Sequence, residues 1–408
     1  MSKPTPQRSA LIAGGGIAGV AAGLALARAG WSVSVHERAA SFEEVGAGLQ
    51  ISPNAARVLD WLGVLDALAP TAFRPERAEL RDGLSGAPVY AAPLGVAAEQ
   101  RWGAPYLHIH RADLLAVLLA AARTAGVTLR TSDAVARYVN TPEAVHVTMA
   151  DGRLEYADLC LGADGLRSSV RTALNGSEQP AFTQQTAWRA LVPRAALPEG
   201  LVAPNATVWA GPGRHVVTYY LRGGALVNLV AVEERPDWTE EDWSLEGDPE
   251  RLRAAFTGWH PAVTGLLAAV ERAHVWGLFL RPEQVRWAEG RVALVGDAAH
   301  AMLPFMAQGA AMALEDVTEL IRALQGAPDI PSALLAYERA RWPRVARVQA
   351  RSRANAKLFH KRTALGRLSA WTPIRLVSRF APGLAAGQLD WLYGQDPTAG
   401  LAPLRQGT

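Results

Sequence analysis

The stretch LIAGGGIAGVAAGLALARAGWSVSVHER, residues 11–38, constrains the fold of this chain more than any other segment. A short apolar run predicts a buried strand over residues 10–13, and the small residues after it predict a helix over 17–29. A second β-like run predicts a strand over 32–36. A strand, a helix and a strand in this order form a βαβ unit, the building block of a parallel sheet.

Three glycines and one acid in this unit predict a dinucleotide site. Gly14 permits the tight turn, Gly16 lets the backbone approach a pyrophosphate, and Gly19 lets the helix pack closely on the strand. The helix N-terminus then presents its positive end to the phosphates. Glu37, about twenty residues on, can accept hydrogen bonds from both ribose hydroxyls. A purely structural glycine-rich turn would explain neither the acid nor its spacing.

Length and composition narrow the class of protein. The 408 residues suffice for a sizeable core and two lobes, and the composition, half hydrophobic and 19% charged, is globular. A formal net charge of +3 does not call for a nucleic-acid partner. The single cysteine, Cys160, excludes an intrachain disulfide and fits a reducing cytoplasm. We expect a cytoplasmic protein with no signal peptide, no integral membrane segment and no metal site.

FAD and NAD both suit the opening motif, and two later stretches decide between them. DLCLGADGLRSSVR (158–171) is an apolar strand that ends in Asp-Gly and is followed by a basic helix start. GRVALVGDAAHAMLPFMAQGAAMALEDVTEL (290–320) is another apolar strand that ends in Gly-Asp, followed by a loop and a helix. Together with the opening motif, these stretches resemble the single-component FAD-dependent aromatic hydroxylases, in the right order from about residue 9 to about residue 350.

The resemblance assigns flavin contacts to this sequence. Asp297 would bind the ribityl and pyrophosphate region of FAD. Asp164 and Gly165 would touch both FAD and the incoming nicotinamide cofactor, and Arg167 beside them would help to dock NAD(P)H. Arg111, in HIHRADLLAVLLAAA, matches the flavin-contacting arginine of the family at a helix start. The other expected FAD contacts, besides the glycines and Glu37, are Ala18, Arg38, Gln50, Gly309 and Ala310.

The same resemblance implies the chemistry. NADH or NADPH would reduce FAD, and the reduced flavin would take O2 to form a C4a-hydroperoxide that attacks an electron-rich ring carbon. The chain has no second GxGxxG, so the nicotinamide would dock without a Rossmann domain of its own, and Glu37 does not distinguish NADH from NADPH. Because an ionised phenol is the better nucleophile, a base should lie near the substrate hydroxyl.

The middle of the chain predicts a different architecture. Several β-like runs with short glycine-rich connections indicate an antiparallel sheet, and residues 249–270 indicate helices that cover it. The expected fold is therefore α/β, a Rossmann-like FAD-binding domain with an inserted antiparallel-sheet substrate domain and C-terminal helices. The strands are expected at 184–194, 206–210, 214–222 and 225–233. The expected boundaries are 1–75, 106–182 and 278–350 for the FAD-binding domain, 76–105 and 183–277 for the substrate domain, and 351–408 for the C-terminal helical segment.

One of these strands, RHVVTYYLR, carries the candidate catalytic residues. Side chains alternate across a strand, so His215 and Tyr219 share one face. The similar enzymes have a substrate-contacting histidine and tyrosine at these positions, and a histidine can act as a base near neutral pH. The alternative is a solvent-facing strand. Pro304 and Phe305, in the LPFMAQGA loop, are expected to line the substrate pocket, with simple packing as the alternative for Phe305.

Within the family, the resemblance is nearest to salicylate hydroxylases, 3-hydroxybenzoate 6-hydroxylases and 6-hydroxynicotinate 3-monooxygenases. It rests on GAGLQISPNAARVL (46–59), GPGRHVVTYY (211–220) and MAQGAAMALED (306–316). Gln50 replaces a histidine of the pyridine hydroxylases, and Pro304 replaces a substrate-contacting glutamine of the 3-hydroxybenzoate enzymes. Both departures argue against those two substrates.

We expect NAD(P)H- and O2-dependent hydroxylation of a small phenolic acid, salicylate or another monohydroxybenzoate. Two alternatives stay open. One is oxygen insertion into a non-benzoate substrate, by epoxidation or by hydroxylation of a quinone precursor, which would not need His215. The other is a flavin-binding oxidase or sensor without a hydroxylase role.

The region 339–379 is rich in arginine and predicts a helix. We interpret these arginines as a solvated helix face, with contact to a second subunit in a homodimer or to anionic lipid as the alternative. For Trp188, Trp209 and Trp276, core packing is favoured over an aromatic-binding cavity. The arginines in question are Arg339, Arg341, Arg344, Arg347, Arg351 and Arg353.

Overall fold

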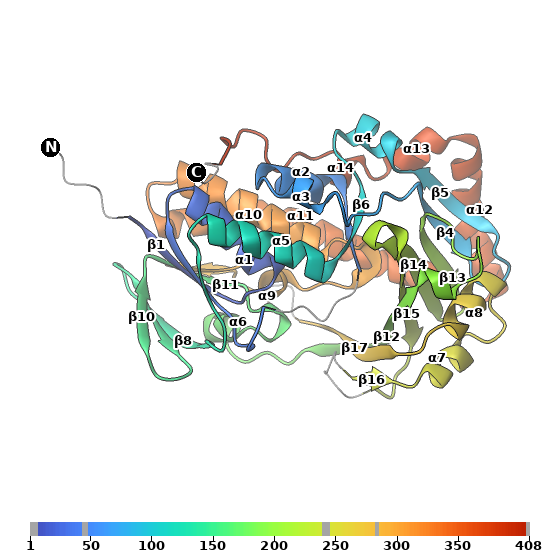
Figure 1. The fold of residues 1–408 in the computed structure, drawn as a ribbon, viewed down its shortest axis with the longest axis horizontal. Helices are drawn as coiled ribbons and strands as arrows, with labels where there is room; N and C mark the ends of the chain where they lie inside the picture. The colour runs from blue at the N-terminus through green and yellow to red at the C-terminus, as the bar shows by residue number, and fades with distance from the viewer. Residues whose placement is uncertain (1–6, 43–47, 239–244, 282–284, 405–408) are drawn as a thin grey trace.

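The computed structural model describes residues 7–42, 48–238, 245–281 and 285–404, and two lobes lie side by side in it (Figure 1). The first lobe is built on a six-stranded sheet whose central strands are parallel, as the βαβ pattern predicts. In spatial order its strands are β18 (Ala288–Glu289), β19 (Val292–Leu294), β11 (Leu159–Gly162), β1 (Ser9–Ala13), β2 (Ser32–His36) and β7 (Thr128–Arg130).

Helices rich in alanine and leucine cover this sheet. Helix α1 (Ile17–Arg28) connects β1 to β2 and is buried over most of its length, because its small residues let it pack between the sheet and other helices. It contacts α5 (Arg111–Thr124) and α10 (Gly309–Gly326), and α10 contacts α2 (Pro53–Trp61) and α11 (Ile330–Phe359). Shorter elements complete the lobe: α3 (Leu65–Leu68), α4 (Val96–Trp102), α6 (Ser169–Asn175), α9 (Asp297–His300), the pair β3 (Gly48–Ile51) and β6 (Leu107–His110), and the sheet of β8 (Val135–Asn140), β9 (Val145–Met149) and β10 (Leu154–Ala157).

The second lobe is built on an eight-stranded sheet. All of its pairs are antiparallel except β13 with β4, which is parallel. The expected antiparallel sheet is therefore present, with one parallel pair added. In spatial order its strands are β16 (Glu246–Gly247), β17 (Ala273–Leu280), β12 (Ala181–Pro193), β15 (Leu226–Glu234), β14 (Arg214–Leu221), β13 (Ala206–Gly211), β4 (Arg77–Asp82) and β5 (Pro88–Pro93).

The two faces of this sheet have different neighbours. The outer face packs Trp188 and Trp209 against α7 (Pro249–Ala255) and α8 (Pro261–Ala268), so these two tryptophans belong to a core, as favoured. The inner face packs against the 3-10 turn η4 (Pro304–Met306), the end of α11 and α12 (Ala364–Phe380). Helices α12 and α13 (Pro382–Gly387) lie beside β5, and α14 (Asp390–Tyr393) follows near α2.

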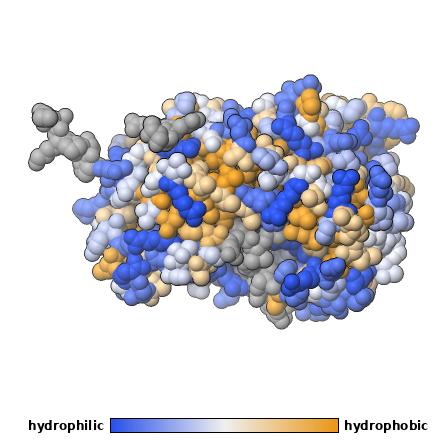
Figure 2. Space-filling view, in the orientation of Figure 1, coloured by the Kyte–Doolittle hydropathy of each residue, from blue (hydrophilic) through white to orange (hydrophobic). Residues whose placement is uncertain are grey.

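Helix α11 links the two lobes. It runs without interruption from Ile330 to Phe359, so residue 350, the expected domain boundary, lies inside it. No helix among the described residues is long and apolar enough to span a membrane. Hydrophilic and hydrophobic residues are interspersed over the face of the molecule shown in Figure 2.

Candidate active site

Three motifs meet at the carboxyl ends of adjacent parallel strands. A Cβ atom on Gly14, which follows β1 with φ +108°, would lie 2.3 Å from the carbonyl oxygen of Ala163, just after β11. A Cβ atom on Gly296, just after β19, would lie 2.9 Å from the Cβ of Ala18 in α1. The glycine-rich loop, the Asp-Gly motif and the Gly-Asp motif are therefore in direct contact. Ligands bind at this edge of open α/β sheets.

The glycine-rich loop combines a close approach of α1 to β1 with a glycine at the N-terminus of the helix. A Cβ atom on Gly19 would lie only 2.0 Å from the carbonyl oxygen of Gly14, so α1 can sit this close to β1 only with glycine there. Gly16 is the N-cap of α1, where the helix presents unpaired N–H groups. The close approach at Gly19 agrees with the helix packing expected of it, and the pyrophosphate role of Gly16 stays a prediction.

Glu37 follows β2 and points back at this loop. Its Oε2 accepts a hydrogen bond of 2.7 Å from the backbone N–H of Gly15, and its Oε1 accepts one of 2.9 Å from Ala39. Because each carboxylate oxygen can accept more than one hydrogen bond, the side chain is oriented and still able to bind ribose hydroxyls. Arg38 next to it is exposed.

Asp164 accepts a hydrogen bond from the start of α6 and has acceptor capacity left. Its Oδ2 accepts a hydrogen bond of 2.7 Å from the backbone N–H of Ser169 at the start of α6. Its Oδ1 is buried and makes no hydrogen bond within the described residues. A buried acceptor without a donor is costly, and a cofactor that brings a donor removes that cost. Gly165 has φ +73° and open space on its Cβ side, and Arg167 is exposed.

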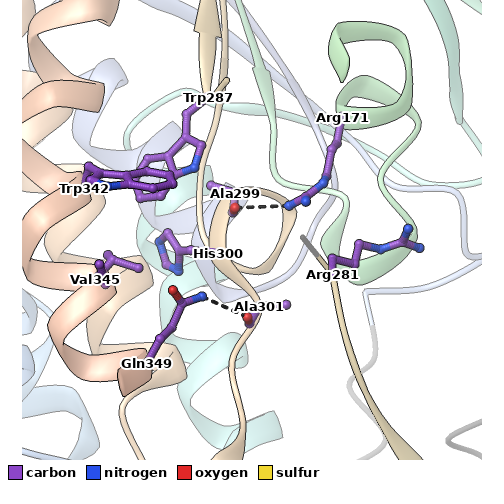
Figure 3. Close-up of a pocket in the computed structure, with 10 residues that line it drawn as sticks. Arg171, Arg281, Trp287, Ala299, His300, Ala301, Trp342, Val345 and Gln349 are labelled. Atoms are coloured by element: carbon purple, nitrogen blue, oxygen red, sulfur yellow. Dashed lines mark hydrogen bonds between the residues drawn. The ribbon is translucent and has the colours of Figure 1, made fainter. Parts of the chain in front are cut away.

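Asp297 begins α9 with an exposed side chain, and Arg111 begins α5. Burial lowers the pKa of Arg111, and the carboxylate of Asp297 opposes that shift, so these two expected flavin contacts are close enough to interact electrostatically. Figure 3 shows how α9 is held from two sides. Arg171 of α6 donates to the carbonyl of Ala299 at 3.1 Å, and Gln349 of α11 donates to that of Ala301 at 3.2 Å.

The arginine-rich helix α11 corrects one of our expectations. Arg341 is buried, with its Nε 2.8 Å from Asp316 Oδ1 and its Nη1 2.7 Å from Glu315 Oε2, and Arg344 also pairs with Glu315. The solvated-face interpretation is wrong for these two arginines, because α10 places two buried carboxylates opposite them. Asp316 in turn accepts a hydrogen bond of 2.9 Å from the backbone N–H of Gly296.

Helix α11 also holds the loop between α9 and α10. Ser352 donates to the carbonyl of Leu303 at 2.7 Å, and Asn355 donates to that of Phe305 at 2.9 Å. Within this loop Pro304 is exposed and Phe305 is buried. The loop then enters α10 at Gly309 and Ala310, and Gly309 has open space on its Cβ side.

The inner face of the large sheet lies against this loop. His215 pairs in register with Val232, and Tyr219 pairs with Asn228, so their side chains project from the same face. The ring of His215 lies 5.1 Å from that of Phe305, and the ring of Tyr219 lies 4.7 Å from that of His108. The alternation in the sequence predicts this shared face. The alternative of a solvent-facing strand is wrong, because both side chains are buried.

The environment of these two side chains shifts their titration. Burial, and then the neighbouring His360, hold the pKa of His215 well below its ordinary value of 6.5. Burial raises the pKa of the Tyr219 hydroxyl well above its usual range. Our expectation of a histidine that titrates near neutral pH is therefore corrected: His215 is neutral at pH 7, and a neutral imidazole can accept a proton. Gln50, on neighbouring β3, accepts a hydrogen bond of 2.7 Å from Tyr106.

The structure adds Arg189, which our sequence analysis missed. It lies in β12 opposite Val230 on the inner face, and its guanidinium stacks over the ring of Trp276 at 4.6 Å. Its Nε is buried and makes no hydrogen bond within the described residues, and no carboxylate there pairs with it. Burial, and then the positive charge of Arg111, lower the pKa of Arg189 to about 10. The detectable signal was a lone cation within the apolar strand AWRALVP.

These features fit FAD. The glycine cradle, the oriented Glu37, the free acceptor of Asp164 and the open space beside Gly309 suit a dinucleotide whose flavin end reaches the inner face of the large sheet. Residues 7–352 match the FAD binding domain family. The chain is also 40% identical, over 388 residues, to a 3-amino-4-hydroxybenzoate 2-monooxygenase of Streptomyces platensis, with 94% of this chain and 95% of that relative covered. The chain belongs to the FAD-dependent aromatic monooxygenases.

Two further comparisons agree. This monooxygenase is 36% identical to a 3-hydroxybenzoate 6-hydroxylase of Aquipseudomonas alcaligenes, with 95% of this chain and 97% of the relative covered. Its fold matches a salicylate hydroxylase solved as a substrate complex with a TM-score of 0.81, at 28% identity and with all of both chains covered. The family expected from the sequence is confirmed. FAD is its cofactor, and NAD(P)H and O2 are its co-substrates.

Proposed function

We propose that this monooxygenase hydroxylates a small phenolic acid, salicylate or another hydroxybenzoate. The observation that carries the proposal is Arg189, a half-buried cation with a buried Nε that makes no hydrogen bond and with no carboxylate partner among the described residues. It lies on the same sheet face as Tyr219. A charge that is largely removed from water is stabilised by a counter-charge, and the carboxylate of an aromatic acid would supply it. The names of two relatives, a 3-amino-4-hydroxybenzoate 2-monooxygenase and a 3-hydroxybenzoate 6-hydroxylase, denote acids of this kind.

The flavin would be held by the residues of the three motifs. Gly14, Gly16 and Glu37 would bind the adenosine and pyrophosphate part, and Asp297 and Arg111 the ribityl part. When bound and reduced by NAD(P)H, FAD supplies the activated oxygen for the reaction. Backbone N–H groups at the start of α10 would contact the polar edge of the flavin.

The remaining work falls to the inner face of the sheet. Arg189 would bind the carboxylate, and Tyr219 would orient the phenolic hydroxyl. His215 would accept the phenolic proton, which makes the ring more electron-rich where oxygen is added. The buried ring of Phe305 would help to keep water out of the pocket.

A substrate panel tests the proposal. The purified holoenzyme is mixed with NADH or NADPH and with salicylate, 3- and 4-hydroxybenzoate, 3-amino-4-hydroxybenzoate, benzoate, or the methyl ester of each hydroxy acid. We expect hydroxy acids to stimulate NAD(P)H oxidation and to gain one oxygen atom by mass spectrometry, while the esters do so poorly. If none of these acids is oxygenated, the panel is extended to an alkene and a quinone precursor, and turnover with one of those would favour the non-benzoate alternative. Peroxide formation that no aromatic acid affects would favour the oxidase or sensor alternative.

We also propose that the enzyme acts in the cytoplasm as a homodimer. A reducing compartment suits Cys160, which is a buried free thiol. Helices α12 and α13 expose large apolar side chains, including Leu365, Phe380 and Leu384, and a second copy of the chain would cover them. Sedimentation velocity should show a dimer that Phe380→Glu weakens, and a wild-type monomer at micromolar concentration would contradict this.

A further inference from the structure

A chain of polar groups leads from the buried His215 to solvent. His215 Nδ1 lies 2.7 Å from His360 Nε2, and His360 Nδ1 lies 3.3 Å from Glu234 Oε1. Glu234 pairs with Arg362, whose side chain is 73% exposed. His215 itself is 1% exposed. The three groups therefore connect the interior of the predicted substrate pocket with the surface.

Two parts of the fold bring these groups together. His215 lies in β14, and Glu234 is the last residue of β15, the neighbouring strand. His360 is the C-cap of α11. The turn before β14 joins them, because the backbone N–H of Gly213 donates to the carbonyl of His360 and its carbonyl accepts from the backbone N–H of Glu234.

Apolar rings surround the inner end of the chain. The ring centroids of Phe305 and Phe359 lie 5.1 and 5.3 Å from that of His215. Among the described residues, the hydrogen bond to His360 is the only one that the His215 side chain makes. Among the described residues, a proton that reaches His215 from the pocket therefore has one polar route onward, through His360.

The contact between the two rings requires that only one of the two facing nitrogens carries a hydrogen. Burial lowers the pKa of both histidines, so both are neutral at pH 7 and one ring donates while the other accepts. If His215 carries its hydrogen on Nδ1, it donates to His360 Nε2, and its own Nε2 is free to accept a proton. His360 then carries its hydrogen on Nδ1, the atom nearest to Glu234. In this arrangement a proton can move from His215 through His360 to Glu234.

We propose that His215, His360 and Glu234 form a relay that carries the phenolic proton of the substrate to solvent. One proton enters at His215 Nε2, one moves from His215 Nδ1 to His360 Nε2, and one leaves His360 Nδ1 for Glu234. Each ring ends as the opposite neutral tautomer, and Glu234 releases its proton to water. The relay resets when His215 Nε2 returns a proton to the site and another enters at Glu234. The relay rests on the proposed function in one respect, namely that a bound phenol supplies the proton.

Few charged groups act on the two histidines of the relay. Within the described residues, the charged or titratable groups that act on the two histidines are each other, Glu234 and Arg362. The Nδ1–H of His360 is not aimed directly at the Glu234 oxygen, so a small side-chain rotation completes the path. A purely structural role would instead make the His215–His360 bond a tie between β14 and α11.

Ionisation of a bound phenol separates the two roles. A nitro-substituted hydroxybenzoate, whose phenolate is coloured, is mixed with oxidised holoenzyme in a stopped-flow instrument, together with a pH indicator that reports proton release. His360→Gln keeps a hydrogen-bonding group beside His215 but cannot relay a proton. We expect phenolate formation about 10²-fold slower, in the range typical of lost acid–base groups, with a dissociation constant within about twofold of wild type. Glu234→Gln, at the surface end, should slow it as well.

Controls and a second measurement make the test decisive. Imidazole in the buffer should restore the rate in His360→Ala, and His260→Gln should behave as wild type, because His260 stacks on Trp209 at the outer face. Nitrogen-15 NMR of the imidazoles should show hydrogen on Nδ1 of both His215 and His360 without any substrate. Wild-type ionisation rates in both His360→Gln and Glu234→Gln, or hydrogen on His215 Nε2, would overturn the relay. Failure of every hydroxybenzoate to bind would contradict the proposed function instead.

Discussion

Because Arg341 is buried, we predict that its replacement lowers the stability of the protein. The sequence pattern alone would predict that the replacement is tolerated. An arginine in a solvated helix face tolerates replacement, whereas Arg341 neutralises two buried carboxylates. Arg341→Met preserves the length and apolar stem of the side chain and removes the charge. Arg339→Met is the matched control, because Arg339 lies two residues earlier in the same helix and is exposed.

The magnitude follows from what the substitution leaves behind. Glu315 would keep Arg344 and the 2.8 Å hydrogen bond from Asn54. Asp316 would keep its hydrogen bonds with His300 and the backbone N–H of Gly296 but would lose its guanidinium partner. Removing one partner of a buried ion pair costs about 3–5 kcal/mol. Exposed substitutions usually change stability by less than about 0.5 kcal/mol. Because Gly296 precedes Asp297, Arg341→Met should also weaken FAD retention.

Urea unfolding, followed by tryptophan fluorescence and by the fluorescence of released FAD, measures both effects. We expect Arg341→Met to unfold at clearly lower urea concentration and to release FAD earlier, while Arg339→Met follows wild type. If unfolding is irreversible, the rate of unfolding at a fixed urea concentration replaces the midpoint. Equal behaviour of the two variants would refute the argument that Arg341 supports the flavin site.

Other substitutions test the site directly. Glu37→Ala should weaken FAD binding about 10- to 150-fold, from the loss of about 1.5–3 kcal/mol of charged hydrogen bonds, and unchanged affinity by fluorescence titration would refute the ribose assignment. Asp297→Ala should yield folded apo-protein with an unchanged circular dichroism spectrum, and full FAD content in that variant would rule out its flavin role. Arg189→Met should weaken binding of the substrate acid by a similar factor and leave its methyl ester unaffected, as measured by flavin absorbance changes; equal losses for both ligands would show that the carboxylate is bound elsewhere. Burial lowers the pKa of His108 to about 3, so below about pH 6.5 the unfolded chain gains a proton that the folded chain does not. The free energy of unfolding therefore decreases as the pH is lowered from about 6.5 to about 4. His108→Leu should reduce this decrease, measured as the urea midpoint at each pH.

Local patterns predicted those parts of the site in which the chemistry is carried by neighbours in sequence. Gly14, Gly19 and Glu37 lie within one βαβ unit, so their spacing already specifies their geometry. The alternation in β14 similarly predicts that His215 and Tyr219 share a face. In each case, periodicity within one element determines which way the side chains point.

The parts that the sequence did not reveal depend on partners far along the chain. Arg341 looks like its neighbours in α11, and only the contact with α10 shows that it meets Glu315 and Asp316. His360 gives no local signal, because the turn that joins it to β14 is about 150 residues away in sequence. Arg189 did interrupt an apolar strand, but its environment depends on Trp276 and on the absence of a carboxylate among the described residues around it.

The length of α11 has a consequence for how this enzyme can be recombined with its relatives. At 1.5 Å per residue the helix is about 45 Å long. Its middle carries Arg341, which braces the flavin site, and its end carries Phe359 and His360, which touch the substrate sheet. A chimera that takes its substrate sheet from another relative must therefore choose on which side of α11 to join the parents. Either junction leaves one end of the helix facing a surface with which it did not evolve, so exchange of substrate specificity should require α11 to be redesigned together with the sheet.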